Sequence, residues 1–122
     1  MGLDQSAYTK ESYAGDSARQ ELMYWRKHNR LQGWMQRLWK HRGGIGDFNC
    51  KELRLTMDDL DDLEAAIKNK KLPKTSGFFF GNDSYEEYDH SEWGYKEADR
   101  IFITKARIAI EDGLEVYYNC WW

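Results

Sequence analysis

The chain has 122 residues and a formal net charge of −3, so it has room for one domain with a substantial core. The slightly acidic balance excludes a protein that coats nucleic acid nonspecifically, because such proteins need a basic domain. No apolar run approaches the length of a membrane span and the first residues lack the apolar core of a signal peptide, so we expect a cytoplasmic location.

The first segment, residues 1–17, mixes small and polar residues without helical or strand periodicity. We therefore expect a disordered leader over residues 1–17 and a single α+β domain over residues 18–122. Asp16 or Ser17 could cap a first helical segment that carries Gln20–Trp25 and reaches an interruption at His28-Asn29. Asn29, which favours caps, would interrupt it and start a second helix.

The stretch Tyr24–Arg42 is basic and rich in tryptophan. It contains six lysines or arginines and no acid, which leaves a net charge of −9 on the rest of the chain. A basic stretch on an acidic body favours a site for an anionic group. Its apolar residues also have a structural interpretation, because their spacing is typical of the core-facing stripe of a helix that Gly43-Gly44 would end. They are Leu31, Trp34, Met35, Leu38 and Trp39.

A strand and a helix follow this stretch. Residues Phe48–Leu55 predict a strand, although their polar and apolar residues do not alternate cleanly. Thr56 is a good N-cap for a helix over 57–71, which Pro73 ends. We interpret the acids on this helix as a solvated face rather than a metal site. Its predicted core stripe is Leu60, Leu63 and Ile67.

The segment after Pro73 is rich in glycine and aromatic residues. Three consecutive phenylalanines lie within Gly77–Gly81, and they cannot all face one core from a strand because side chains alternate. This segment is either a short buried strand or one wall of a binding site. The loop over 82–93 is long and acidic, which is typical of a functional or a mobile segment.

The last part of the chain predicts a helix and a strand. Apolar residues cover over half the circumference of a helix at Glu97–Asp112, so we expect it at the centre of the core, with Ile101 buried. Leu114–Trp122 alternates between two faces, and we expect Trp121 and Trp122 to be packed. The predicted fold class is α+β: a small two- or three-stranded sheet covered by three to four helices. An exposed sheet edge would allow a homo-oligomer.

Cysteine and histidine spacing predicts no metal site and no cofactor. Cys50 and Cys120 lie far apart in the sequence, and we expect both to be reduced and buried. The histidines, His28, His41 and His90, are scattered and form no ligand motif.

The predicted anion-binding group lies where the two helices of the basic stretch would meet, near the positive N-terminal end of the second. It consists of Arg26, Lys27, His28 and Arg30. Four aromatic rings are candidates to stack on a nucleobase: Trp25, Phe78, Phe80 and Tyr85. The competing hypothesis is that acids of the later loop neutralise the basic group internally. These acids are Glu86, Glu87 and Asp89.

Two other functions remain open. An inhibitor could use the acidic loop and exposed aromatic rings against a basic protein surface. A small hydrolase could use His28 or His90 as a general base beside Asp83 or Asp89, although no spacing of nucleophile and base identifies catalytic residues.

Several short motifs mark the chain: YWRKH followed by GWM, then FNCxxLxLT, LPKTSGFFFG and a C-terminal YYxxWW. Together these motifs resemble a family of small bacteriophage proteins of unassigned function, over most of Met23–Trp122. Some relatives bear a phosphoglycerate kinase label, but such a kinase needs two large domains, which 122 residues cannot hold. The resemblance implies an anti-defence accessory protein in the host cytoplasm. It would sequester a phosphate-bearing nucleotide signal, or block a host enzyme by protein–protein contact.

Overall fold

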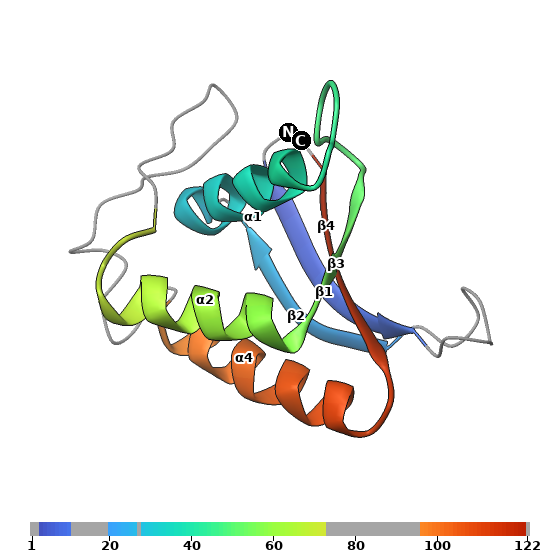
Figure 1. The fold of residues 1–122 in the computed structure, drawn as a ribbon, viewed down its shortest axis with the longest axis vertical. Coiled ribbons are helices and arrows are strands. Elements are labelled where there is room, and N and C mark those ends of the chain that lie inside the picture. Colours follow the sequence, from blue (N-terminus) through green and yellow to red (C-terminus); the bar gives the residue numbers. More distant parts are fainter. Residues whose placement is uncertain (1–2, 11–19, 27, 73–95, 122) are drawn as a thin grey trace.

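The computed structural model describes residues 3–10, 20–26, 28–72 and 96–121 (Figure 1). The phenylalanine-rich segment and the acidic loop that follows it lie outside these ranges. Within the described ranges, no helix has both the length and the apolar character needed to cross a membrane. The elements in chain order are β1 (Asp4–Lys10), β2 (Gln20–Arg26), α1 (Asn29–His41), β3 (Glu52–Leu55), α2 (Met57–Lys68), α4 (Lys96–Glu111) and β4 (Glu115–Trp121).

Four antiparallel strands form one sheet in the order β2-β1-β4-β3 (Figure 1). β1 lies inside the sheet, between β2 and β4, so the expected disordered leader is wrong for residues 4–10. The side chains that β1 buries on its core face are Gln5, Ala7 and Thr9. None of them is large and apolar, which is why the strand shows no hydrophobic alternation.

The segment expected to form a helix before Trp25 is strand β2 instead. Trp25 is 2% exposed, whereas its neighbours Tyr24 and Arg26 are exposed, which is the alternation of a strand. Helix α1 begins at Asn29, with His28 at its N-cap position. The predicted junction of two helices is therefore a junction between a strand and a helix.

All three described helices lie against the same face of the sheet (Figure 1). The core stripe of α1 is confirmed by the burial of Leu31 and Met35, and Gly43 ends the helix with a φ of 93°. The N-cap of α2 is also confirmed, because Thr56 and Asp59 exchange the two hydrogen bonds of a capping box. The predicted stripe of α2 is fully buried: Leu60, Leu63 and Ile67.

Helix α4 buries a narrower stripe than its sequence predicts. Phe102, Ile103, Ala106 and Ala109 face the core, whereas Ile101 is 41% exposed. The expectation that Ile101 is buried is therefore wrong. One side of α4 contacts α2, β2 and β4, so apolar residues on its opposite side stay in contact with solvent.

Of the two remaining strands, β3 is shorter than predicted and β4 matches its prediction more closely. β3 is limited to Glu52–Leu55, and Phe48 is buried outside it, with its ring stacked against that of Trp39. The alternation of β4 is confirmed, because Val116, Tyr118 and Cys120 are buried. Trp121 is exposed, contrary to the expectation that its ring is packed, because it points to the face of the sheet that bears no helix.

Each edge strand has a backbone carbonyl bound by a cationic side chain. Arg42 Nη1 donates to the carbonyl oxygen of Arg54 on β3 at 2.5 Å. Lys105 Nζ donates to the carbonyl oxygen of Leu22 on β2 at 3.5 Å. Such contacts reduce the tendency of an edge to pair with another chain. The fold class is α+β as predicted, with four strands rather than two or three.

Candidate functional site

Trp25 lies in the core rather than in a binding site. Its ring meets that of Phe102 edge to face, with centroids 5.1 Å apart, and its indole N–H donates to Asp99 Oδ1 at 2.9 Å. This burial leaves no face of the indole for a nucleobase, so the structure gives no support to the predicted stacking role of Trp25.

His28 is also enclosed. Its Nε2 lies 2.8 Å from Asp99 Oδ2, and its backbone N–H donates to Gln5 Oε1 at 2.9 Å. Since the side chain is buried, it can neither meet a phosphate at the surface nor act as the general base of a hydrolase without opening the core. The arrangement instead ties the start of α1 to α4 and β1.

The predicted arginines do not converge. Arg26 projects from the face of β2 opposite Trp25, and its Nε lies 3.9 Å from Asp4 Oδ1. Arg30 Nη1 donates to the carbonyl oxygen of Leu72 at 2.8 Å, on the helix-bearing side. The other predicted site residues lie outside the described residues, as do the loop acids of the competing hypothesis. These are Lys27, Phe78, Phe80 and Tyr85, with Glu86, Glu87 and Asp89.

A buried polar network surrounds Tyr118. Its hydroxyl donates to Gln32 Oε1 at 2.6 Å and accepts from Gln5 Nε2 at 2.8 Å, while Gln32 Nε2 donates to Cys120 Sγ at 3.3 Å. Burial raises the pKa of Cys120 to about 11 and that of Tyr118 well above its usual value. Both groups are therefore neutral near pH 7, and the network holds α1 against the sheet.

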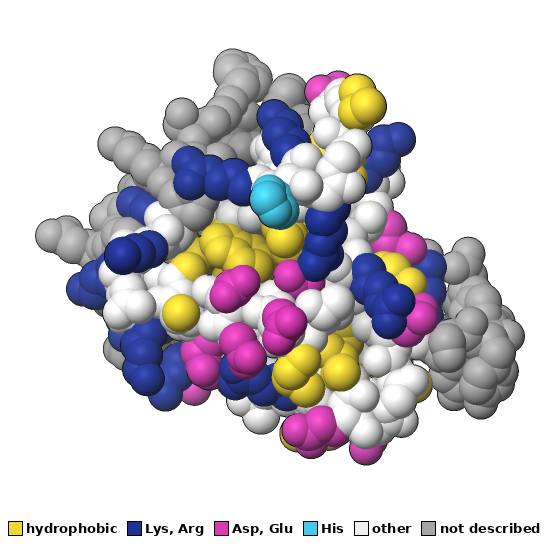
Figure 2. Space-filling view, in the orientation of Figure 1, with side chains coloured by type: hydrophobic (Ala, Val, Ile, Leu, Met, Phe, Trp, Pro, Cys, Tyr) yellow, Lys and Arg dark blue, Asp and Glu magenta, His cyan; other side chains and the backbone are white. Residues whose placement is uncertain are grey.

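The described cysteines and acids form no metal centre. Cys50 is exposed, contrary to the expectation, and Cys120 is buried; both are free thiols. Among the described residues, no three His, Cys, Asp or Glu side chains gather where they could hold a metal ion. Acidic side chains run along the solvent-facing side of α2, and lysines and arginines gather at its C-terminal end (Figure 2).

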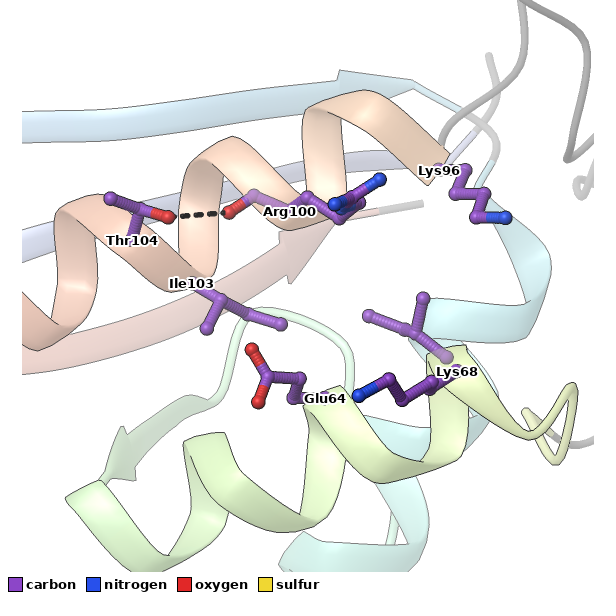
Figure 3. A pocket seen from close by; sticks show the side chains of 7 residues that line it. Glu64, Lys68, Lys96, Arg100, Ile103 and Thr104 are labelled. Carbon is purple, nitrogen blue, oxygen red and sulfur yellow. Dashed lines mark hydrogen bonds between the residues drawn. The ribbon is translucent and has the colours of Figure 1, made fainter.

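A cleft of about 390 Å³ opens between α2 and α4, and we call it the α2–α4 cleft (Figure 3). The two helices pack antiparallel, so the C-terminal end of α2 lies beside the N-terminal end of α4 (Figure 1). This packing brings together cationic side chains from distant parts of the sequence. The cleft is lined by Glu64, Ile67 and Lys68 from α2 and by Lys96, Arg100, Ile103 and Thr104 from α4.

The charges around the α2–α4 cleft favour an anion. Lys68 is the last residue of α2 and Lys96 the first of α4, and Arg100 follows Lys96 by one helical turn on the same face. The first turn of α4 adds the partial positive charge of a helix N-terminus, which the exposed carboxylate of Glu97 in the same turn offsets in part. Lys96 and Arg100 from α4 and Lys68 from α2 thus bring positive charge to both sides of the cleft, with the Lys68 side chain reaching toward Glu64 (Figure 3).

Among the described lining residues, Glu64 is the one carboxylate, and it is already engaged. Arg107 Nη1 donates to Glu64 Oε2 at 2.9 Å, and this hydrogen bond lowers the pKa of the Glu64 carboxyl. Glu64 therefore stays ionised and paired with Arg107. The charge of Lys68 also lowers this pKa, so Glu64 offsets part of the charge of Lys68 as well. The spacing of Lys96 and Arg100 in the sequence predicts that they share one face of a helix. The sequence around them does not indicate that Lys68 lies opposite.

Comparison of the chain with protein-family models, with curated proteins and with solved structures gives no match. The functional argument therefore rests on the geometry and charge of the α2–α4 cleft.

Proposed function

We propose that the chain binds and sequesters a phosphate-bearing small molecule of the nucleotide class in the α2–α4 cleft. The observation that supports this proposal is the gathering of Lys68, Lys96 and Arg100 around a floor made by Ile67 and Ile103. Guanidinium and ammonium groups are the usual protein partners of phosphate oxygens, and a guanidinium can hold two of them at once.

The dimensions of the cleft fit this ligand class. Its volume of about 390 Å³ falls in the range of small-molecule sites, roughly 300–1,000 Å³. Ile67 and Ile103 are buried beneath it and offer apolar contact to the part of the ligand that carries no charge. The cleft thus combines a charged wall for phosphate with an apolar surface for a ring.

The described lining contains no histidine or cysteine, and its single carboxylate is paired with Arg107. Its lysines and Thr104 belong to residue types that can act as acid, base or nucleophile in enzymes. The proposal of binding therefore rests on the charge and shape of the cleft. In the phage setting that the sequence motifs imply, a protein of this kind would withdraw a nucleotide signal from the host.

Calorimetric titration with inorganic phosphate, AMP and ATP tests the proposal. We expect binding that strengthens with the number of phosphates, and we expect Arg100→Ala to weaken it more than tenfold. Arg37→Ala is the matched control, because it removes an exposed guanidinium from α1, outside the cleft. Arg26→Ala should leave the affinity unchanged, because Arg26 lies on the other face of the sheet.

Two outcomes would contradict the proposal. Equal losses from Arg100→Ala and Arg37→Ala would show that the ligands respond only to the overall charge of the surface. Failure of all three compounds to bind, together with the absence of any small molecule in mass spectra of the purified protein, would exclude nucleotide sequestration.

A further inference from the structure

The face of the sheet that bears no helix carries a second pocket, of about 270 Å³, which we call the sheet pocket. Strand alternation explains its composition: Gln5, Trp25 and Cys120 turn toward the helices, so their neighbours along each strand turn outward. The outward side chains that line the pocket include Asp4, Ser6, Glu21, Tyr24, Asn119 and Trp121.

Two aromatic rings flank the sheet pocket and face solvent. Tyr24 on β2 is 53% exposed and Trp121 on β4 is 63% exposed. Their strands lie on either side of β1, and the register places Ser6 opposite both Tyr24 and Asn119. β2 and β4 are about 9.6 Å apart, which is twice the spacing between neighbouring strands. Trp121 lies opposite Asp4, so the two rings are diagonal neighbours across β1, with the small side chain of Ser6 beside Tyr24 and the Asp4 carboxylate beside Trp121. A flat group that enters between the rings would meet both.

The charged lining of the sheet pocket is acidic. Asp4 and Glu21 lie in the lining, and no described lining residue is a lysine or arginine. The Tyr24 hydroxyl donates to Asp4 Oδ1 at 2.5 Å, which fixes the carboxylate at the pocket and raises the pKa of Tyr24. Hydrogen-bond acceptors and ring faces therefore dominate the surface that a ligand would meet.

We propose that the sheet pocket binds the guanidinium group of an arginine side chain from a partner protein. A guanidinium is flat and cationic, so it stacks on tyrosine and tryptophan rings while its N–H groups donate to carboxylates. Within the chain, Arg26 forms an ion pair with Asp4 on the same face, with its Nε 3.9 Å from Asp4 Oδ1. Charge complementarity thus indicates a basic segment as the partner.

Single-stranded nucleic acid fits this pocket less well. Exposed rings on a sheet can stack on bases, but such sites also need cations to hold the backbone. Here Asp4 and Glu21 would repel phosphates. The inference therefore goes beyond the proposed nucleotide site: it concerns the opposite face of the sheet, a different ligand charge and a macromolecular partner.

The test uses a peptide of alternating arginine and glycine, compared with the same peptide carrying citrulline, which has the shape of arginine without its charge. In an NMR titration of the full chain, the arginine peptide should shift the indole signal of Trp121. We expect the citrulline peptide to bind at least tenfold more weakly. Trp121→Ala and Glu21→Gln should each weaken arginine-peptide binding at least fivefold.

Matched controls separate this pocket from general surface charge. Ile108→Ala and Glu111→Gln replace an exposed apolar residue and an exposed acid on α4, away from the sheet pocket, and should leave peptide binding unchanged. Arg100→Ala should also leave it unchanged, which distinguishes the result from that at the α2–α4 cleft. Thermal melting of each variant verifies that the fold is intact.

Three results would overturn the proposal: equal affinity for the arginine and citrulline peptides, equal losses from Glu21→Gln and Glu111→Gln, or no binding of the arginine peptide. Tighter binding of a thymidine oligonucleotide at the same face would also overturn it and would assign the rings to nucleic acid.

Discussion

The Nε2 atom of His28 lies 2.8 Å from Oδ2 of Asp99 in the interior of the protein, and both side chains are almost fully buried. Asp99 Oδ1 accepts a hydrogen bond from the indole of Trp25. One carboxylate on α4 thus satisfies a polar group from β2 and another from the start of α1. A single side chain thus joins three elements: β2, α4 and the start of α1.

Replacing Asp99 with alanine should destabilise the protein strongly. The change removes an acceptor from both His28 and Trp25, and breaking a buried polar pair of this kind costs about 3 kcal/mol. Urea denaturation measures the free energy of unfolding. Glu97→Ala, which removes an exposed carboxylate from the same turn of α4, should cost less than about 1 kcal/mol. Similar losses in the two variants would contradict the role of Asp99.

Leu63→Ala and Ile101→Ala should differ in their effect on stability. Leu63 is fully buried, and removing such a side chain costs about 2–5 kcal/mol. Ile101 is exposed on the outer side of α4, so its loss should change the free energy of unfolding by less than about 1 kcal/mol. Chemical denaturation of both variants measures the difference, and a larger loss for Ile101→Ala would show that the face of α4 is wrongly placed.

Deleting residues 1–10 should abolish folding, because β1 supplies the strand between β2 and β4. Loss of the cooperative thermal transition is the expected result. A finer test compares Ala7→Leu with Ser6→Ala. Ala7 is fully buried, so overpacking it should cost about 1–3 kcal/mol, whereas Ser6 faces the sheet pocket and its change should be nearly neutral. A cooperative transition in the deletion variant would contradict the central position of β1.

Stability should decline at alkaline pH through Cys120. Its pKa is raised to about 11 in the folded protein from an ordinary value of 9.0, so folding favours the neutral thiol. This contribution is fully present below pH 9 and is lost as the pH rises to about 11, with a total of about 2–3 kcal/mol. Urea titration at several pH values measures the free energy of unfolding. In Cys120→Ala this free energy should fall less steeply with rising pH than in the unchanged protein.

Cys50→Ala is the control for this prediction, because Cys50 is exposed. The pH dependence of its stability should stay close to that of the unchanged protein, because Cys50 makes only a smaller contribution than burial to the raised pKa of Cys120. A thiol reagent at pH 8 should label Cys50 readily and Cys120 only on unfolding. Rapid labelling of Cys120 in the folded protein would contradict its burial.

Sequence reasoning succeeded where the determinants are local. The Thr56 cap, the apolar stripe of α2 and the alternation of β4 each depend on residues within a few positions of one another, and the structure confirms them. It failed at β1, whose inward Gln5 is stabilised by Tyr118 and by the backbone of His28, contacts that no local pattern reveals. Sequence reasoning also failed at β2, because a short run of polar and aromatic residues is compatible with both the helical and the strand period.

The position of the candidate site was not predicted from the sequence, and its anionic ligand class stays a prediction. An anion site was expected from the basic stretch, but Trp25 and His28 of that stretch are buried, and Arg26 and Arg30 point apart. The charges that do converge come from the end of α2 and the start of α4. Their proximity follows from the antiparallel packing of two helices, which composition and spacing do not specify.

The pairing of β1 with β4 has a consequence for how the protein is made. Asp4 pairs with Trp121, so the inner pair of strands joins the first described element to the last. During synthesis β1 can pair with β2, but its other edge stays open until β4 has left the ribosome. Pairings of such high sequence separation slow folding, and a nascent chain with an open inner strand is prone to aggregation. The sheet is therefore completed only after translation has passed its last strand.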